Sequence, residues 1–172
     1  AKGQLRLYAH QLPGNSKNLW DAPNLLLQKF PAEEFTTTTK LTFHPNEKLV
    51  NEKAGLVVMG MAYAYLALES KNDGIYLKYA VNENAEKGNR EKEQVIKKIN
   101  GNSVVLRVKV NKDETCTFSY SEDGKEFTAI KEKFKALPGK WIGAKVGIFA
   151  TQEEKINDSG YADFDWFRFS KY

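Results

Sequence analysis

The sequence has 172 residues and a mass of 19.5 kDa, the size of one domain with a continuous core. Hydrophobic residues make up 41% and charged residues 28%, which excludes collagen-like, disordered and low-complexity chains. Lys and Arg number 26 against 22 Asp and Glu, a net charge of +4, and the two signs are interleaved. We therefore predict one folded unit over residues 1–172 and no nucleic-acid partner.

Cysteine content and hydropathy exclude two further classes. The single cysteine, Cys116, cannot form an internal disulfide or a Cys-x-x-Cys metal site. The longest apolar stretch, Ala54 to Leu68, is interrupted by Gly55 and Gly60, so no membrane-spanning helix is predicted. The start, Ala1 to Leu7, is typical of a strand and not of a secretory signal, which indicates a piece of a longer protein.

Short β-rich runs, many with alternating apolar and polar residues, follow one another along the whole chain. About a dozen such strands predict an all-β fold, a two-sheet antiparallel sandwich or jelly roll with under about 10% helix. In chain order the predicted strands are Gln4 to His10, Leu25 to Phe30, Phe35 to Phe43, Gly55 to Gly60, Ala62 to Glu69, Ile75 to Val81, Val95 to Ile99, Val104 to Val110, Thr115 to Tyr120, Phe127 to Ile130, Lys145 to Ala150 and Tyr161 to Phe169.

Turn residues separate these runs. Asn72-Asp73-Gly74, Asn100-Gly101 and Asp123-Gly124 are turn signals of the hairpin kind, so we expect each to join neighbouring strands. The charged stretch Glu83 to Lys98 has helical Glu and Lys spacings, but Asn and Gly interrupt it, and a loop leading into a strand is the preferred interpretation. The alternation makes these residues core candidates: Phe35, Leu41, Phe43, Leu106, Val108, Phe118, Phe164 and Phe167.

Two carboxylates near the C-terminus form one candidate site. In a regular strand Asp163 and Asp165 share a face with Tyr161, Phe167 and Phe169, with the carboxylates about 7 Å apart. Sandwich glycosidases use two carboxylates ~5 to 9.5 Å apart, so a catalytic pair is one interpretation. The preferred one is a margin of the sheet where the acids are salt-bridged, hydrogen-bonded or hold a hard cation.

A second candidate site is aromatic. Tyr63, Tyr65 and Glu69 share one face of a predicted strand, where flat rings could stack on a sugar as in lectin-like sandwiches. The alternative, which we prefer, is that the tyrosines are half-buried sheet residues with hydrated hydroxyls. Trp141 follows a Pro-Gly turn and Trp20 lies in a turn-rich segment, so each either anchors a partner or closes the end of the core.

Seven segments, taken in order, resemble the C-terminal concanavalin A-like sandwich of family 43 glycoside hydrolases, the β-xylosidase and α-L-arabinofuranosidase group. The resemblance covers essentially the whole chain. The segments are Gly3-Gln-Leu-Arg-Leu, Trp20-Asp-Ala-Pro-Asn-Leu-Leu-Leu-Gln-Lys-Phe, Phe35-Thr-Thr-Thr-Thr-Lys-Leu-Thr-Phe, Ala54-Gly-Leu-Val-Val-Met-Gly with Tyr63-Ala-Tyr-Leu, Phe118-Ser-Tyr-Ser-Glu-Asp-Gly, Gly139-Lys-Trp-Ile-Gly-Ala-Lys-Val-Gly and Gly160-Tyr-Ala-Asp-Phe-Asp-Trp-Phe-Arg-Phe.

The resemblance implies an accessory role. Family members carry their catalytic carboxylates on an N-terminal β-propeller, which is absent here, so the chain is expected to have no turnover of its own. It implies that the sandwich packs on the propeller and that a loop around Trp141 to Lys145 closes one side of the catalytic pocket. A periplasmic or extracellular location and a plant hemicellulose substrate for the parent enzyme follow from the same likeness.

One departure concerns a metal. The chain begins after the first strand of the family's domain, and relatives are expected to hold a structural Ca²⁺ between an acidic residue of that strand and the position of Asp165. Calcium takes six to eight oxygen ligands, so this site is expected to be incomplete here or filled by water. Two other functions stay open: an autonomous carbohydrate-binding module that takes oligosaccharide, and a free-standing glycosidase that uses Asp163 and Asp165.

Overall fold

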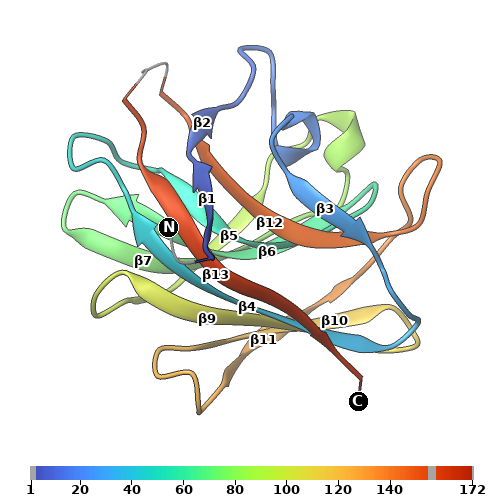
Figure 1. The fold of residues 1–172 in the computed structure, drawn as a ribbon. Helices are drawn as coiled ribbons and strands as arrows, with labels where there is room; N and C mark the ends of the chain where they lie inside the picture. The colour runs from blue at the N-terminus through green and yellow to red at the C-terminus, as the bar shows by residue number, and fades with distance from the viewer. Residues whose placement is uncertain (1–2, 155–157, 172) are drawn as a thin grey trace.

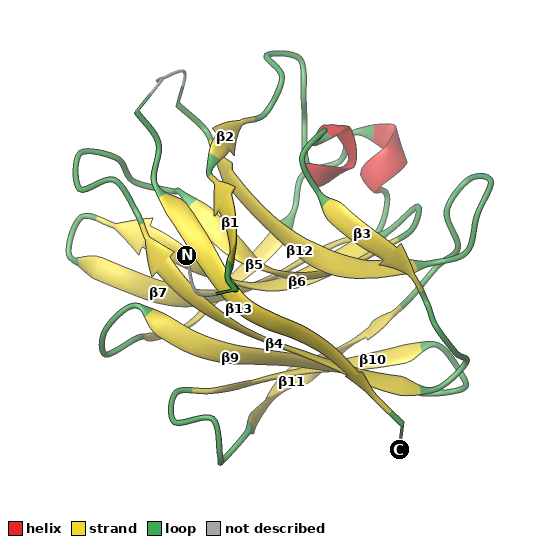
Figure 2. Ribbon diagram, in the orientation of Figure 1, coloured by secondary structure: helices red, strands yellow, loops and turns green. Residues whose placement is uncertain are grey.

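A computed structural model describes residues 3–154 and 158–171, and within them two β-sheets pack face to face (Figure 1). Strands account for 56% of the structure and helix for 4%, and the two short 3-10 turns lie together at one end (Figure 2). The predicted all-β sandwich is confirmed. Glu83 to Lys98 contains one 3-10 turn and then a strand, which confirms the loop-and-strand interpretation of that stretch.

The six-stranded sheet has a simple meander, β9 to β11, on one side and the strands nearest to the two chain ends on the other. In spatial order its strands are β1 (Leu5–Tyr8), β13 (Tyr161–Ser170), β4 (Phe35–His44), β9 (Ser103–Val110), β10 (Thr115–Ser121) and β11 (Thr128–Lys135). Every neighbouring pair is antiparallel.

The seven-stranded sheet forms the other layer. Its order is β2 (His10–Gln11), β12 (Lys145–Gln152), β5 (Lys53–Met59), β6 (Tyr63–Lys71), β7 (Gly74–Asn82) and β8 (Lys92–Lys98), and β3 (Leu26–Lys29) also pairs with β12. The turns η1 (Leu19–Asp21) and η2 (Ala85–Lys87) lie over the outer face of this sheet. That face therefore has a cover of loops.

Two of the three predicted turns join neighbouring strands of one sheet, and the third does not. Asn72-Asp73-Gly74 joins β6 to β7 and Asp123-Gly124 joins β10 to β11, as predicted. The expectation for Asn100-Gly101 is wrong, because it carries the chain from β8 in one sheet to β9 in the other. Ile99, just before this turn, is 4% exposed and belongs to the core, so the chain crosses between layers there.

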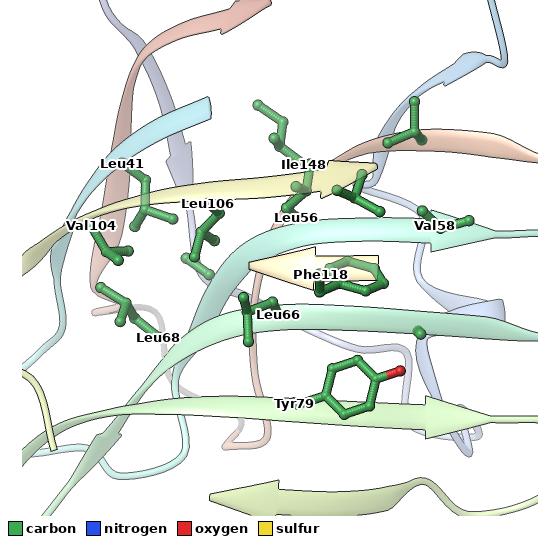
Figure 3. Close-up of a cluster of buried hydrophobic side chains, with 14 of the residues drawn as sticks. Leu41, Leu56, Val58, Leu66, Leu68, Tyr79, Val104, Leu106, Phe118 and Ile148 are labelled. Atoms are coloured by element: carbon green, nitrogen blue, oxygen red, sulfur yellow. The ribbon is translucent and has the colours of Figure 1, made fainter. Parts of the chain in front are cut away.

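The main core fills the space between the sheets, and Figure 3 shows part of it. Seven of the eight predicted core residues are buried: Phe35, Leu41, Phe43, Leu106, Val108, Phe118 and Phe164. Phe167 is partly buried and packs against the same cluster.

A β-bulge explains why Phe164 and Phe167 can both face the core although a regular strand would place them on opposite faces. The register between β13 and β4 shifts between Phe164 and Trp166, which leaves Asp165 as the extra residue. The Thr39 hydroxyl of β4 donates to the Trp166 carbonyl oxygen at 2.8 Å beside the bulge. The alternation of the strand is therefore reversed after Asp165.

Candidate functional site

Strand β6 presents two tyrosines to the outer face of the seven-stranded sheet, opposite to Ala64 and Leu66, which face the core. The predicted division of faces is confirmed, but accessibility is not. Tyr63 and Tyr65 are both 0% exposed, so neither the stacking platform nor the half-buried alternative describes them. Leu19 and Ala85 of the two short turns pack with them in a second apolar cluster that covers this part of the sheet.

One carboxylate accepts both tyrosine hydroxyls. Tyr63 donates to Glu91 Oε1, and Tyr65 donates to Glu91 Oε2 at 2.7 Å. The backbone N–H of Leu19 in turn donates to the Tyr63 hydroxyl oxygen at 3.1 Å, which ties η1 to the sheet. Burial, with the nearby Glu91 charge, raises the pKa of both tyrosines, so they remain hydroxyl donors at neutral pH. Glu91 is a residue that the sequence did not single out.

Glu69 lies farther along the same face of β6 and is buried by ion pairs. Its carboxylate contacts Lys78 Nζ of the next strand and Lys71 Nζ at 2.7 Å. Lys78 also reaches Glu93 of β8 at 2.9 Å. A residue that is 1% exposed and paired in this way has no free oxygen at the surface, so the expected sugar-facing position of Glu69 is wrong.

Lys53 of β5 extends this charged network. Its ammonium lies 3.6 Å from Glu93 and 3.3 Å from Glu153. Burial favours the neutral amine, but the surrounding carboxylates of Glu91, Glu153 and Glu93 outweigh it and raise the pKa of Lys53. The group stays cationic and links Glu93 of β8 to Glu153 just after β12.

These side chains border a cavity of about 620 Å³, here called the polar hollow. It lies on the outer face between the loop after β2, the segment before β8 and the end of β12. Its lining includes Gln11, Lys17, Lys53, Tyr65, Arg90, Glu91, Glu93 and Gln152. The volume suits a small ligand, and the walls offer several hydrogen-bonding groups.

A second cavity of about 360 Å³ lies on the other side of η1 and is here called the tryptophan hollow. The structure brings Trp20 and Trp141 to it from distant parts of the sequence, together with Lys145 at the start of β12. Trp141 is 90% exposed. The Met61 N–H donates to the Pro138 carbonyl at 3.0 Å and fixes the base of the loop that carries Trp141.

The two C-terminal carboxylates lie apart from both hollows and are occupied. Arg6 of β1 donates to Asp163 through Nε at 2.7 Å and Nη2 at 2.8 Å. Lys40 contacts Asp165 at 2.9 Å, and Gln4 also donates to it. The hydrogen bond from Arg6 lowers the pKa of Asp163, and the one from Lys40 lowers that of Asp165. This is the salt-bridged interpretation preferred from the sequence.

The bulge corrects the predicted surroundings of these acids. Phe167 and Phe169 were expected on the face of the carboxylates, but both pack against the core because the alternation reverses at Asp165. The surroundings also do not fit a calcium ion at Asp165. Lys40 provides a cation already, and no group of three or more His, Cys, Asp or Glu side chains able to hold a metal occurs in residues 3–154 and 158–171.

The family described as the β-xylosidase C-terminal concanavalin A-like domain matches residues 1–170. The chain belongs to this family. A curated β-xylosidase from Formosa agariphila is 28% identical over 157 residues, which are 91% of this chain and 25% of the relative. The chain therefore spans about a quarter of that protein, as part of a larger family 43 polypeptide.

Solved structures agree with the family. A family 43 protein from Bacillus licheniformis has a TM-score of 0.75 at 24% identity, covering 98% of this chain and 33% of its own. A bifunctional family 43 protein from Bacteroides eggerthii has a TM-score of 0.80 at 21% identity, covering 100% of this chain and 21% of its own. At these identities the likeness shows the fold. Among the helices that the structure describes, none is long and apolar enough to span a membrane.

Proposed function

We propose that this β-xylosidase C-terminal domain is a non-catalytic support for an N-terminal catalytic β-propeller in the same polypeptide. The observation that carries the proposal is the tryptophan hollow. Trp141 is 90% exposed on a loop whose base is fixed, and Trp20 and Ile142 lie beside it. A large aromatic residue held in water is typical of a surface that a partner covers.

Lys145 and Trp141 are the residues through which this surface would complete the catalytic pocket. Both border the tryptophan hollow, one as a cation and the other as an apolar ring, a pair that can position a sugar or the rim of a neighbouring domain. The parent enzyme would act on xylan or a related plant hemicellulose, outside the cell or in the periplasm. The chain by itself would hydrolyse no glycoside.

The test uses the full-length parent enzyme with Trp141→Ala and Lys145→Ala, assayed on short xylo-oligosaccharides. We expect a reduced kcat/KM, with an unchanged melting temperature, because the loop would position substrate. Lys131→Ala on the exposed edge strand β11 is the control, since it removes a cation far from the hollow. Wild-type kinetics in both variants would contradict the pocket-closing role.

The alternative function is an autonomous carbohydrate-binding module, and the polar hollow favours it. Its volume of about 620 Å³ and its polar walls suit an oligosaccharide. Of the three residues expected to contact sugar, Tyr65 borders the polar hollow. Tyr63 would only position Glu91, and Glu69 would only position Lys78. Calorimetry of the 172-residue chain with xylo- and arabino-oligosaccharides, repeated with Gln11→Ala, tests this function. Measurable binding that Gln11→Ala weakens would favour it.

The calcium expected at Asp165 from the family resemblance does not fit the Lys40 ion pair, and a separate experiment tests this. If the ion is structural, adding calcium after chelation raises the melting temperature, and Asp165→Asn abolishes the rise. From the Lys40 ion pair we expect no rise.

A further inference from the structure

A third cavity, of about 530 Å³, lies on the outer face of the six-stranded sheet, on the side of the sandwich away from both hollows described above. It is here called the basic hollow. Three strands build its floor, β13, β4 and β9, and the turn between β10 and β11 forms one wall. The proposed propeller contact lies on the other sheet and does not involve this face.

The strand register sets two arginines on either side of a threonine. Arg168 of β13 lies opposite Thr38 of β4, and Thr38 lies opposite Arg107 of β9. Adjacent strands are about 4.8 Å apart, so the two arginine backbones are about 10 Å apart with the Thr38 hydroxyl between them. Two residues along, Trp166 lies opposite Lys40 in the neighbouring row. Both arginines therefore line the basic hollow with Thr38 on the strand between them.

Each guanidinium is placed over an aromatic ring. Arg107 lies 3.4 Å from the centroid of Phe127, and Arg168 lies 4.5 Å from that of Trp166. Stacking of this kind holds the planar group while leaving its N–H donors at the edge available. Arg107 Nε donates to Thr38 Oγ1 at 3.3 Å. The rings also give the basic hollow apolar walls.

Neither arginine forms an ion pair with a carboxylate anywhere in the described part of the chain. Two acids, Glu122 and Asp123, also line the basic hollow, and both have other partners. Glu122 pairs with Lys97 at 2.5 Å, and Asp123 accepts from the Lys125 N–H of its own turn at 2.8 Å. Burial lowers the pKa of Arg107, as expected for a cation that loses water without gaining a counter-charge. A bound anion would offset that cost.

We propose that the basic hollow binds an acidic saccharide, with the carboxylate of a uronic acid unit above Thr38 and between Arg107 and Arg168. Guanidinium groups recognise carboxylates through paired N–H donors, and the rings of Trp166 and Phe127 suit the apolar surface of a sugar. The volume of the cavity, about 530 Å³, lies in the range of small-ligand sites. The choice of a saccharide rests on the proposed function, whereas the choice of an anion rests on the two arginines.

The test is calorimetry of the 172-residue chain with a xylo-oligosaccharide that carries one glucuronic acid unit and with the same oligosaccharide lacking it. We expect binding of the acidic form only, weakening as sodium chloride is raised. Arg107→Gln and Arg168→Gln should each lower the affinity by about tenfold or more, since each removes a charge-assisted contact. Lys131→Gln on β11 removes the same charge elsewhere and should leave the affinity unchanged.

Three outcomes would overturn the proposal: equal binding of the neutral oligosaccharide, affinity unaffected by both arginine substitutions, or competition by inorganic phosphate as strong as by the acidic sugar. Arg168 is exposed, so its variant should fold even if Arg107→Gln does not. Failure here leaves the propeller support role intact, because that role is tested at Trp141 and Lys145 on the other sheet.

Discussion

The two faces of strand β6 are equally buried but are held by different interactions. On the inner face Ala64, Leu66 and Leu68 pack into the apolar core between the sheets. On the outer face Tyr63 and Tyr65 are covered by loops, and their hydroxyls depend on a single carboxylate. Alternation along a strand therefore predicts which residues share a face, but not whether that face is open, because the segments that cover it are distant in the sequence.

The largest effect is expected on the inner face. Leu66→Ala leaves a cavity among close-packed side chains and should lower the free energy of unfolding by about 2 to 5 kcal/mol. Urea denaturation monitored by tryptophan fluorescence measures this. Val95→Ala on the edge strand β8, where Val95 is 52% exposed, is the matched control and should cost under about 0.5 kcal/mol. If both variants lost a similar free energy of unfolding, Leu66 would not be part of a close-packed core.

A smaller effect is expected when the outer face loses its acceptor. Glu91→Gln replaces a carboxylate that takes two hydroxyl hydrogen bonds by an amide with one oxygen, and should cost about 1 to 3 kcal/mol. Glu86→Gln, in the exposed part of the same loop, is the control. If the two variants unfold at the same urea concentration, the tyrosine contacts do not hold the loop on the sheet.

The comparison also explains what the sequence could predict. The regular alternation of Phe35 to Phe43 identified β4 and its buried face, because one row of side chains fills one side of a sheet. The charged ends of β8 and β11, over 92–94 and 131–135, were not predicted as strand, because Lys and Glu are weak strand formers. Both are edge strands, where charges face water and discourage pairing with other chains.

The candidate sites were less predictable than the strands for a related reason. The exposed position of Trp141 after a Pro-Gly turn was one of two open interpretations, but its neighbour Trp20 is more than a hundred residues away. The bulge at Asp165 changes the face of every residue after it, and a single extra residue has no signature in the alternation. Arg107 and Arg168 come close together only through the register across three strands, which the sequence does not reveal.

The ion pair at Asp163 gives a pH-dependent effect. Arg6 lowers the pKa of Asp163 below its ordinary 3.8, so the unfolded chain binds the proton more readily than the folded one. The stabilisation is therefore complete above pH 3.8 and is lost as the pH falls through the folded value. Asp163→Asn should lower the melting temperature at pH 7, and the difference from the natural chain should shrink below pH 3.8.

Asp165→Asn provides the matched comparison in that experiment. The Asp165 side chain is 22% exposed, against 9% for Asp163. Its partner is the single ammonium of Lys40, whereas Asp163 binds two nitrogens of the Arg6 guanidinium. Water screens an exposed pair more, so the loss at pH 7 should be the smaller of the two. A pH-independent difference between Asp163→Asn and the natural chain would show that packing and not charge accounts for the loss.

The smallest effect on folding is expected at the tryptophan hollow. Trp141 is 90% exposed, so Trp141→Ala in the 172-residue chain removes little apolar contact and should change the free energy of unfolding by under about 0.5 kcal/mol. Trp20 is partly buried against the apolar cluster that contains Tyr63 and Tyr65, so Trp20→Ala should lower the free energy of unfolding more. Urea denaturation of the two variants measures the difference. A substantial loss for Trp141→Ala would mean that the loop supports the sandwich itself, and the exposed ring would then no longer argue for a partner domain.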